Sequence, residues 1–575
     1  MSMKTIFEFL PNENLLQCFH YLNIIDIFHS FDQLNHRFNS LIRNIPFSLN
    51  FQNIQNKFQC DQFCMKMSMD GTIKNQLYSL HLSNQNTWYP VHFFLSKFSL
   101  LQFSHLRSIT LHSVTRNNWK SIQPMISSIS ELSSFRIIDG ERLSNEIISV
   151  LVMTQLQTLF IPMQLLRESI PDINFSSIMH LSIYKCNFDV LFILFNNAPK
   201  LNYLKIKHIS GNTSNVTTDD IRCIANPANN LKTLHIDGFD NNADYLFSLL
   251  KRTPNLENLI ILCSHYDQNM TNANVWQSLI TTSLPHLKNF KFKFDFSRSS
   301  FSYINEQSLK EFQNDFWYNE HHAYTEVSIA KSSASIYTIP YPSDRFEFLF
   351  EFHRYYDESI DNTNTFNNVK ELIFNPVICS EKCQYHFSNV NLLSLGDPHL
   401  FFANRIQMNY SHLKHLQTMV NLSNIKHLTL LHGSQMESID VFKEIIKSTT
   451  QLTSLEMKLS ELKLLFEDDE ICKYFTESIR KLKISYDPLS KPYRLKPFYK
   501  ILINLKELKC SLNELDTLLL IKNLPILTYL EIYIFSYEYE TFWVREEVQK
   551  LGLDITADCD CDDYPRNLFI WINRN

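Results

Sequence analysis

A short apolar unit recurs along most of the chain and limits the folds that the chain can adopt. The unit is an aliphatic residue, two variable residues, an apolar residue, one variable residue and a further apolar residue, as in Leu77, Leu80 and Leu82. In an extended segment the second and third apolar positions point to one face, and the residue between them points to the other. The unit therefore predicts a short strand with one buried and one outward-facing side.

Sixteen such units form two groups. The first group begins at Leu77, Leu106, Leu132, Leu156, Ile178, Leu201, Leu231, Leu256 and Leu287, at intervals of 22 to 31 residues. The second begins at Val369, Val390, Ile425, Leu452, Ile479, Leu505 and Leu527, at intervals of 21 to 35 residues. Leucine-rich repeats are typically about 20 to 29 residues long. We therefore predict an α/β solenoid with parallel strands on its concave face and helices on its convex face.

Helical segments precede several of the units. Residues 190–195, 245–250 and 276–280 are rich in apolar side chains, and a proline follows each of them before the next unit begins. Proline cannot continue a helix, and it favours an extended conformation in the residue before it. The repeated order of helix, proline and strand predicts that the chain returns along the convex side between strands.

The repeat register is interrupted for 82 residues between Leu287 and Val369. Residues 324–330 and 335–340 alternate in polarity around the polar joint 331–334, which predicts a β-hairpin. We interpret the stretch as irregular repeats that carry this hairpin; the alternative is an elaboration that faces a substrate. Towards the end of the chain, a helix over 541–551, an acidic solvated loop over 558–563 and a strand over 568–572 are expected to cap the last repeat.

The first fifty residues follow a helical period instead. The apolar residues of the first segment at this spacing are Leu10, Leu16, Phe19 and Leu22. A second run, from Ile27 to Ile42, continues in steps of three and four. Pro11 lies where the first turn of a helix tolerates proline, and Asp26 is a candidate N-cap for the second helix.

These residues also carry a resemblance to a known family. The string Leu10-Pro11-x-Glu13-x-Leu15-Leu16-x-x-Phe19-x-Tyr21-Leu22-x-x-x-Asp26-Ile27, continued by Leu34-Asn35-x-Arg37-Phe38-x-x-Leu41-Ile42, resembles an F-box. It departs from the family at Phe38, where tryptophan is usual, and at Phe31-Asp32, where small or aliphatic residues are commoner. Phe38 keeps the aromatic character, and an aspartate at position 32 is compatible with a solvent-facing side chain.

The resemblance implies a three-helix module that docks the Skp adaptor of a cullin-based ubiquitin ligase. The residues that it assigns to the adaptor surface are Leu10, Pro11, Leu15, Leu16, Phe19, Leu22, Asp26, Ile27 and Leu34. The alternative is an ordinary helical cap on the repeats. An F-box followed by this array resembles the F-box and leucine-rich-repeat class of substrate receptors, although the repeats lack the regular asparagine or cysteine of its best-known members.

The composition argues against several function classes. Only seven glycines occur, and no two are close enough for a dinucleotide-binding or phosphate-binding loop. A net charge of -6 without a sustained basic run argues against nucleic acid as the main partner. No apolar run approaches the roughly 20 residues of a membrane span. Twelve scattered cysteines and an N-terminal apolar stretch interrupted by Glu8 and Pro11 favour the cytoplasm or nucleus over secretion.

Few residues are spaced for chemistry. Cys379, Cys383 and His386 are soft ligands within eight residues, but they lack the fourth ligand of a closed zinc site, so we interpret them as ordinary loop residues. His321 and His322 lie beside aromatic residues at the start of the irregular stretch. We expect no metal, no cofactor and no catalytic group, and hence a protein that is not an enzyme. An enzyme with its site in the irregular stretch is the most distant alternative.

The outward strand positions are the candidates for binding a protein substrate. The residues chosen from them are Tyr203, Lys205, His235, Ile260, Lys291 and Ile373. The predicted organisation is an F-box (1–50), a linker (51–75), a first repeat region (76–295), the irregular stretch with its hairpin (296–366), a second repeat region (367–535) and a cap (536–575). The predicted function is substrate recognition within a Skp–cullin–F-box ligase; the alternative is a non-catalytic scaffold that acts outside a ubiquitin ligase.

Overall fold

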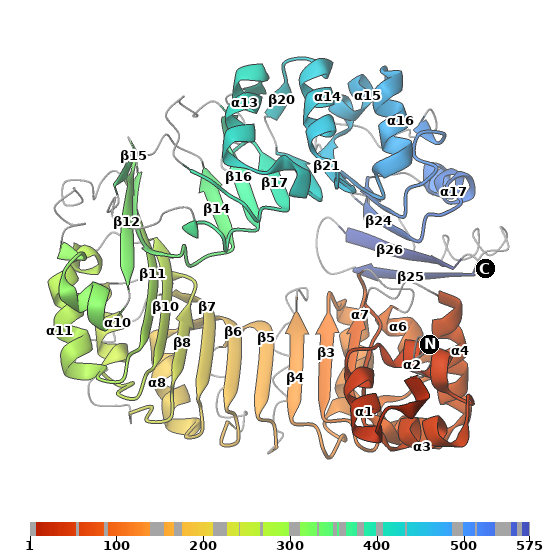
Figure 1. Ribbon diagram of the computed structural model, residues 1–575, viewed down its shortest axis with the longest axis horizontal. Helices are drawn as coiled ribbons and strands as arrows, with labels where there is room; N and C mark the ends of the chain where they lie inside the picture. The colour runs from red at the N-terminus through yellow and green to blue at the C-terminus, as the bar shows by residue number, and fades with distance from the viewer. Residues whose placement is uncertain are drawn as a thin grey trace, which may run out of the picture. The chain divides into compact units, whose positions relative to one another are not determined.

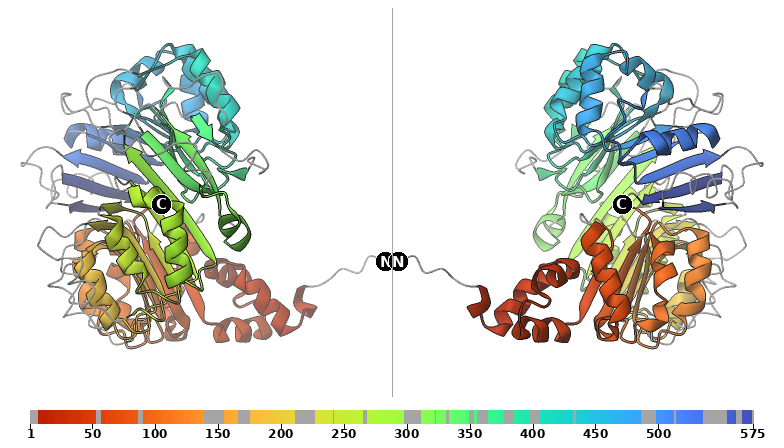
Figure 2. Two further views of the ribbon diagram at one scale, coloured as in Figure 1. Left: turned by 90° about the vertical axis from the view of Figure 1, so that its left-hand side faces the viewer. Right: turned by 90° about the vertical axis from the view of Figure 1, so that its right-hand side faces the viewer.

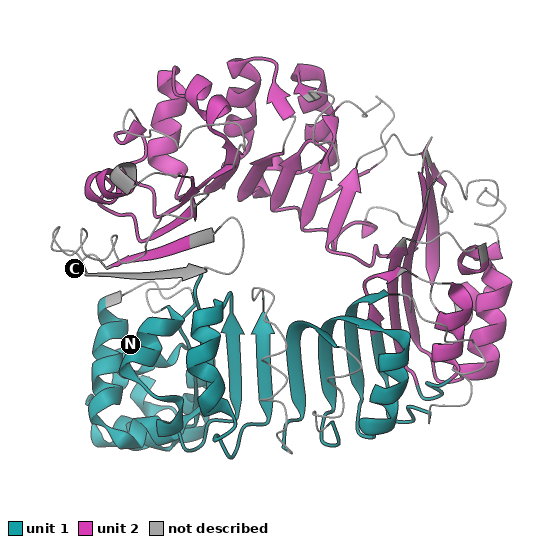
Figure 3. Cartoon of the chain, turned by 180° about the vertical axis from the view of Figure 1, so that it is seen from behind, with its two compact units in different colours: residues 1–234, 252–255 teal, residues 235–251, 256–575 magenta. Residues whose placement is uncertain are grey.

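The computed structural model divides the chain into two compact units (Figure 3). The first contains residues 1–234 and 252–255, and the second contains residues 235–251 and 256–575. The structure describes residues 7–573 apart from 53–56, 86–89, 139–154, 166–174, 211–226, 241, 265–267, 298–310, 322, 331–332, 349–352, 356–363, 377–384, 398–405, 432–433, 486–497, 512–513, 535–553 and 561–565.

In the first unit, parallel strands lie side by side in chain order (Figure 1). They are β1 (Phe47–Asn50), β2 (Leu77–Ser83), β3 (Ser108–His112), β4 (Ser134–Ile138), β5 (Thr158–Leu165), β6 (His180–Asn187) and β7 (Tyr203–Ser210). The helices among them are α4 (Lys57–Met69), α5 (Gly71–Gln76), α6 (Val91–Lys97), α7 (Arg116–Ile126) and α8 (Phe188–Asn197). Strand β8 (Thr233–Ile236) lies where the chain passes between the units.

The second unit begins with α10 (Ala243–Leu250), β10 (Asn258–Ser264), α11 (Ala273–Ser283) and β11 (Asn289–Ser297). A further parallel sheet follows, with the strand order β14 (Arg345–Phe348), β16 (Glu371–Phe374), β17 (Leu392–Leu395), β19 (His427–Leu430), β21 (Ser454–Lys458), β22 (Lys481–Ser485), β23 (Glu507–Cys510) and β24 (Tyr529–Ile534). Its helices are α13 (Tyr410–Met419), α14 (Ile439–Ser448), α15 (Leu459–Leu465), α16 (Asp469–Ser478) and α17 (Glu514–Asn523).

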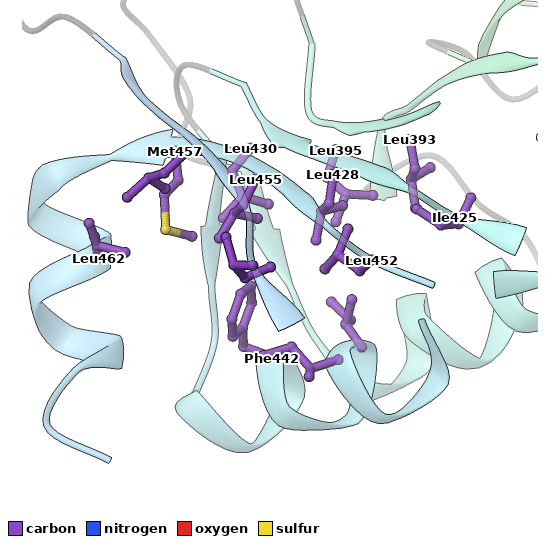
Figure 4. Close-up of a cluster of buried hydrophobic side chains, with 14 of the residues drawn as sticks. Leu393, Leu395, Ile425, Leu428, Leu430, Phe442, Leu452, Leu455, Met457 and Leu462 are labelled. Carbon is purple, nitrogen blue, oxygen red and sulfur yellow. The ribbon is translucent and has the colours of Figure 1, made fainter. Parts of the chain in front are cut away.

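The strands and the burial of the sixteen predicted units fit the predicted solenoid. The second and third apolar residues of each unit lie on a strand, and none of the three apolar side chains is more than 5% exposed. Neighbouring units are in register, as in Leu428, which pairs with Leu393 on one side and Leu455 on the other. Figure 4 shows Phe442 of α14 on the side of Leu455 and Leu462 of α15 on the side of Met457. The buried side of the strands therefore packs against the helices, as the pattern predicts.

The predicted helices are also present. Segments 190–195, 245–250 and 276–280 fall within α8, α10 and α11, and each of these helices ends before the proline that follows it. Figure 1 shows α13, α14, α15 and α16 together on one side of the second parallel sheet.

The first fifty residues form a helical module at the start of the first unit. It contains α1 (Asn12–His20), α2 (Ile24–Phe31) and α3 (His36–Asn44), which form a group beside the first strands (Figure 2). Phe38 is 1% exposed, and its ring lies 5.4 Å from that of Phe31 and 6.5 Å from that of Phe19. The phenylalanine therefore fills an aromatic core at this position.

Two expectations for this module are wrong. The N-cap of α2 is Asn23, whose side chain accepts a hydrogen bond from the Ile25 amide at 3.0 Å, whereas Asp26 lies within the first turn. The Asp32 carboxylate does not face solvent, because it is fully buried and pairs with Arg43 Nη1 at 2.9 Å and with Lys66. Lys66 belongs to α4, which lies outside the F-box-like string and packs against α2.

The irregular stretch contains the predicted hairpin. Strands β12 (Tyr324–Ile329) and β13 (Ser333–Ile339) pair in antiparallel fashion. β13 continues the sheet beside β11, and β15 (His353–Tyr355) pairs with β12. The hairpin is thus a reversal of strand direction at the end of one sheet, before the next parallel sheet begins at β14.

A buried polar network lies on one face of this hairpin. The Arg354 guanidinium bonds both carboxylate oxygens of Glu326, at 2.5 and 2.7 Å. The Tyr337 hydroxyl donates to the same carboxylate at 2.6 Å, and Ser328 joins Tyr337 to Tyr385. Tyr337 and Tyr385 also belong to the apolar core of the second parallel sheet. This face of the hairpin therefore packs against that core and is unavailable to a ligand.

The end of the chain pairs in antiparallel fashion with the last repeat. The expected strand at 568–572 is confirmed as β26 (Arg566–Asn573), which pairs with β24 and with β25 (Asp554–Asp560). The expected acidic loop is wrong for residues 558–560, which lie in β25, because backbone pairing with β26 holds them extended. The expected helix at 541–551 lies outside the described residues.

Candidate protein-binding surfaces

The nine residues assigned to the adaptor surface fall into three groups. Leu15, Phe19 and Ile27 are buried, Leu10 and Leu16 are half-buried, and Pro11, Leu22, Asp26 and Leu34 are exposed. The buried three form the core of the module with Ile24, Phe28 and Phe38. A partner could reach them only if the module unfolded. The candidate surface therefore consists of the other six residues.

The segment before α1 is fixed against α3. The Arg37 guanidinium donates to the Asn12 side chain at 2.9 Å and to the backbone carbonyls of Leu10 and Glu8. Asn35 donates to the Glu8 carboxylate at 2.6 Å. These bonds join residues 25 to 29 positions apart in the chain, so they hold Leu10 and Pro11 in one place beside α3.

Exposed apolar side chains gather on this module. Leu22 is 44% exposed and Leu34 is 59% exposed, although both are large aliphatic residues. Phe9 and Tyr21, which were not assigned to the site, are 79% and 90% exposed. Several exposed apolar side chains on one small module are typical of an interaction surface. The sequence signal for the two additional residues was their position directly beside the assigned ones.

The six outward residues assigned to substrate binding have different surroundings. In the first unit, the Tyr203 ring lies 6.3 Å from that of Phe160, and Lys205 lies in register with Ser182. In the second unit, His235 pairs with Asp237, and Ile260 lies in register with Lys291.

Ile373 was expected to be exposed, and this is wrong. It is 3% exposed at its outward position on β16, between Glu347 of β14 and Ser394 of β17. The face opposite the helices is therefore occluded at this strand, so Ile373 cannot take part in binding without a local rearrangement.

The outward charges of β21 to β24 neutralise one another. Lys483 pairs with Glu456 at 2.8 Å, Lys481 with Glu507 at 2.7 Å and Lys509 with Glu531 at 2.7 Å. Each pair joins neighbouring strands. This part of the sheet therefore presents little net charge to a partner.

The described residues contain no cluster of three or more His, Cys, Asp or Glu side chains placed to hold a metal ion. Cys379, Cys383 and His322 lie outside them, and His321 packs on the Phe316 ring at 4.5 Å. Cys60 and Cys64 are buried in α4, where their mutual hydrogen bond and burial raise the pKa of the Cys60 thiol well above its usual value. Within the described part of the chain, no helix is long and apolar enough to cross a membrane.

Known proteins resemble this chain only weakly. No family model and no curated protein matches the chain. A leucine-rich-repeat protein of Leptospira interrogans is 13% identical, with a TM-score of 0.23 over 80% of this chain and 97% of that one. The leucine-rich-repeat ectodomain of the Arabidopsis thaliana membrane receptor kinase GASSHO1/SCHENGEN3 is 12% identical, with a TM-score of 0.19 over 80% of this chain and 44% of that one. The repeat assignment therefore rests on strand order, register and burial.

Proposed function

We propose that this chain is the substrate-binding subunit of a Skp–cullin–F-box ubiquitin ligase, with the helical module docking the Skp adaptor and the outward strand faces holding a protein substrate. The module supports this function by its separation of core from surface. Leu15, Phe19 and Ile27 form its interior, while Leu22 and Leu34 remain exposed although burial would be favourable for them. Together with the exposed Phe9 and Tyr21, these leucines form an apolar surface on one small module, which favours a docking role over an ordinary helical cap.

In this role the chain carries out no chemistry of its own, and it needs neither metal nor cofactor. It holds the substrate near a ubiquitin carrier that the cullin recruits, in the cytoplasm or the nucleus. Binding two partners through one chain makes their encounter effectively intramolecular, and the gain is a higher local concentration of substrate lysines.

The test is adaptor binding by the full chain, with substitutions confined to exposed residues. Leu22→Asp and Leu34→Asp place a charge on the candidate surface without entering the core. We expect each to weaken adaptor binding by about tenfold or more, since exposed leucines at an interface centre become fully desolvated on binding. Leu464→Asp is the matched control, because Leu464 is 57% exposed and lies in the second unit. It should bind as the native chain does.

The outcomes separate the candidate functions. Binding by the native chain and by Leu464→Asp but not by the two module variants, together with recovery of a cullin in the same complex, supports the receptor. Adaptor binding without a cullin favours the scaffold that acts outside a ubiquitin ligase. A folded native chain that binds no adaptor overturns the F-box assignment.

A further inference from the structure

The outward face of strands β4 to β7 carries cations and aromatic rings side by side. Its six main residues, here called the cationic–aromatic patch, are Arg136, Phe160, Tyr184, Tyr203, Lys205 and Lys207. The strand register places Arg136, Phe160, Ser182 and Lys205 in one row across the four strands. All of these residues belong to the first unit. The row lies on one face of the sheet, and the buried apolar residues of the same strands lie on the other face.

The aromatic rings hold the cations in place. The Arg136 guanidinium lies 4.7 Å from the centre of the Phe160 ring, and the Lys207 ammonium lies 5.4 Å from that of Tyr184. The Phe160 and Tyr203 rings are stacked at 6.3 Å with 26° between their planes. Cation–π contacts of this kind restrain a side chain without neutralising its charge. The patch is therefore preorganised for an anionic ligand.

The charge of this face is not balanced within its own strands. β4 to β7 contain one arginine and three lysines but no aspartate or glutamate.

We infer that the cationic–aromatic patch binds an acidic segment of a protein, whose anionic groups meet Arg136 and Lys205 or Lys207 and whose apolar side chains lie on Phe160 and Tyr203. In the terms of the proposed function, on which this reading rests, the segment belongs to the substrate. The anionic groups are carboxylates or phosphorylated side chains, since a guanidinium bonds both.

A protein segment fits the patch better than a nucleic acid does. Four cations on four strands, in a chain of net charge -6, are few for tracking a phosphate backbone. Arg136 and Lys205 are three strands apart in one row, a distance of about 14 Å at the usual strand spacing. An extended peptide covers that distance in about four residues. The ligand should therefore carry anionic residues four positions apart, with an aromatic residue between them.

The experiment measures binding of fluorescent peptides to the full chain by anisotropy. The probe has two glutamates four positions apart around a phenylalanine; companion probes replace the glutamates with phosphoserines or lysines, and a single-stranded DNA of similar length is the fourth. Arg136→Glu and Lys207→Glu reverse charges in the patch. Lys120→Glu is the control, because Lys120 is an exposed lysine on α7 of the same unit.

We expect the acidic probe to bind and the lysine probe not to bind. Arg136→Glu and Lys207→Glu should each weaken binding by about tenfold or more, while Lys120→Glu leaves it unchanged. Tighter binding of the phosphoserine probe would assign the anionic groups to phosphate, and equal or weaker binding would assign them to carboxylate. Lys207 is exposed, so its variant remains informative if Arg136→Glu does not fold.

Three results would overturn the inference: equal binding of the acidic and lysine probes, equal loss in Lys120→Glu and Arg136→Glu, or tighter binding of the DNA with the same dependence on Arg136. Adaptor binding measured on the same variants keeps the two proposals apart. A chain that binds the acidic probe through Arg136 but binds no adaptor refutes the receptor and retains the patch. A chain that binds the adaptor but no acidic probe refutes the patch and retains the receptor.

Discussion

The buried ion pair between Arg354 of β15 and Glu326 of β12 offers a sharp test of the second unit. Its side chains are 4% and 0% exposed, and the carboxylate accepts two bonds from the guanidinium and one from Tyr337. The Arg354 guanidinium also lies over the rings of Phe366 at 5.2 Å and Tyr385 at 4.8 Å. The pair thus joins the hairpin to the core of the following sheet.

Arg354→Met replaces the guanidinium with an apolar side chain of similar reach. It leaves a buried carboxylate with a single donor, Tyr337, and breaking a buried pair in this way costs about 3–5 kcal/mol. Arg354→Met combined with Glu326→Gln removes the isolated charge while an amide still meets the Tyr337 hydroxyl. We expect the double variant to be more stable than Arg354→Met alone, with a coupling of about 1–3 kcal/mol.

The appropriate assay is amide hydrogen exchange in β12 and β13. A chain with two units need not unfold in one step, so the opening free energy of these strands is better defined than a global value. Arg345→Met is the control, because Arg345 pairs with Glu347 at 2.8 Å while both side chains are exposed. That change should cost less than about 1 kcal/mol. The reasoning fails if Arg354→Met lowers the opening free energy no more than Arg345→Met, or if the double variant is the less stable.

Three further predictions concern single positions. Asp32→Asn removes a buried charge that pairs with Arg43 and Lys66, and it should lower the stability of α2, α3 and α4 by about 1–3 kcal/mol, measured by hydrogen exchange of these helices. Burial raises the pKa of the Glu461 carboxyl from 4.5 to about 7, with Lys458 opposing the effect. Between pH 4.5 and about pH 7 the folded chain therefore keeps a proton on Glu461 that the unfolded chain has lost. The stability of the fold should be highest below this pH range and should fall as the pH rises through it. Thermal unfolding of Glu461→Gln should lack this pH dependence. Gly396 has a φ of +124°, and a Cβ at this position would overlap Ser434 Oγ. Gly396→Ala should therefore destabilise β17 by about 1–3 kcal/mol, which would appear as faster amide hydrogen exchange in β17. An unchanged exchange rate would contradict the predicted strain.

The exposed residues of the proposed adaptor surface could be only partly predicted from the sequence. The F-box-like string contains core and surface leucines of the same chemical type, and the helical period alone does not distinguish Leu15, which is buried, from Leu34, which is 59% exposed. The distinction depends on which side of each short helix meets its neighbours. Phe9 and Tyr21 were missed although each adjoins an assigned residue, since adjacency alone does not show that an aromatic side chain is exposed.

The repeats, in contrast, were determined locally. The second and third apolar residues of all sixteen units lie on strands, because the inward residues of a strand are fixed by a period of two, and one buried face leaves a single favourable register. Two strands with the same burial were missed, β1 and β14. The positions three residues before their inward strand residues Leu49 and Phe346 are Pro46 and Ser343, so the leading aliphatic residue of the unit is absent at that spacing.

Only the tertiary structure decided what the other face of each strand meets. Ile373 is buried at an outward position, Asp32 pairs with Lys66, and Ser328 bonds Tyr385, which is 57 residues away in the chain. A local period specifies which residues must leave water, because burial of apolar surface is favourable whichever neighbours provide it. It does not specify which distant segment covers an outward side chain, since that depends on how the hairpin and the helices pack on the sheets. The buried inward side chains of the strands can therefore be predicted from the sequence, whereas the surroundings of the outward side chains, where we propose that partners bind, depend on contacts between distant segments.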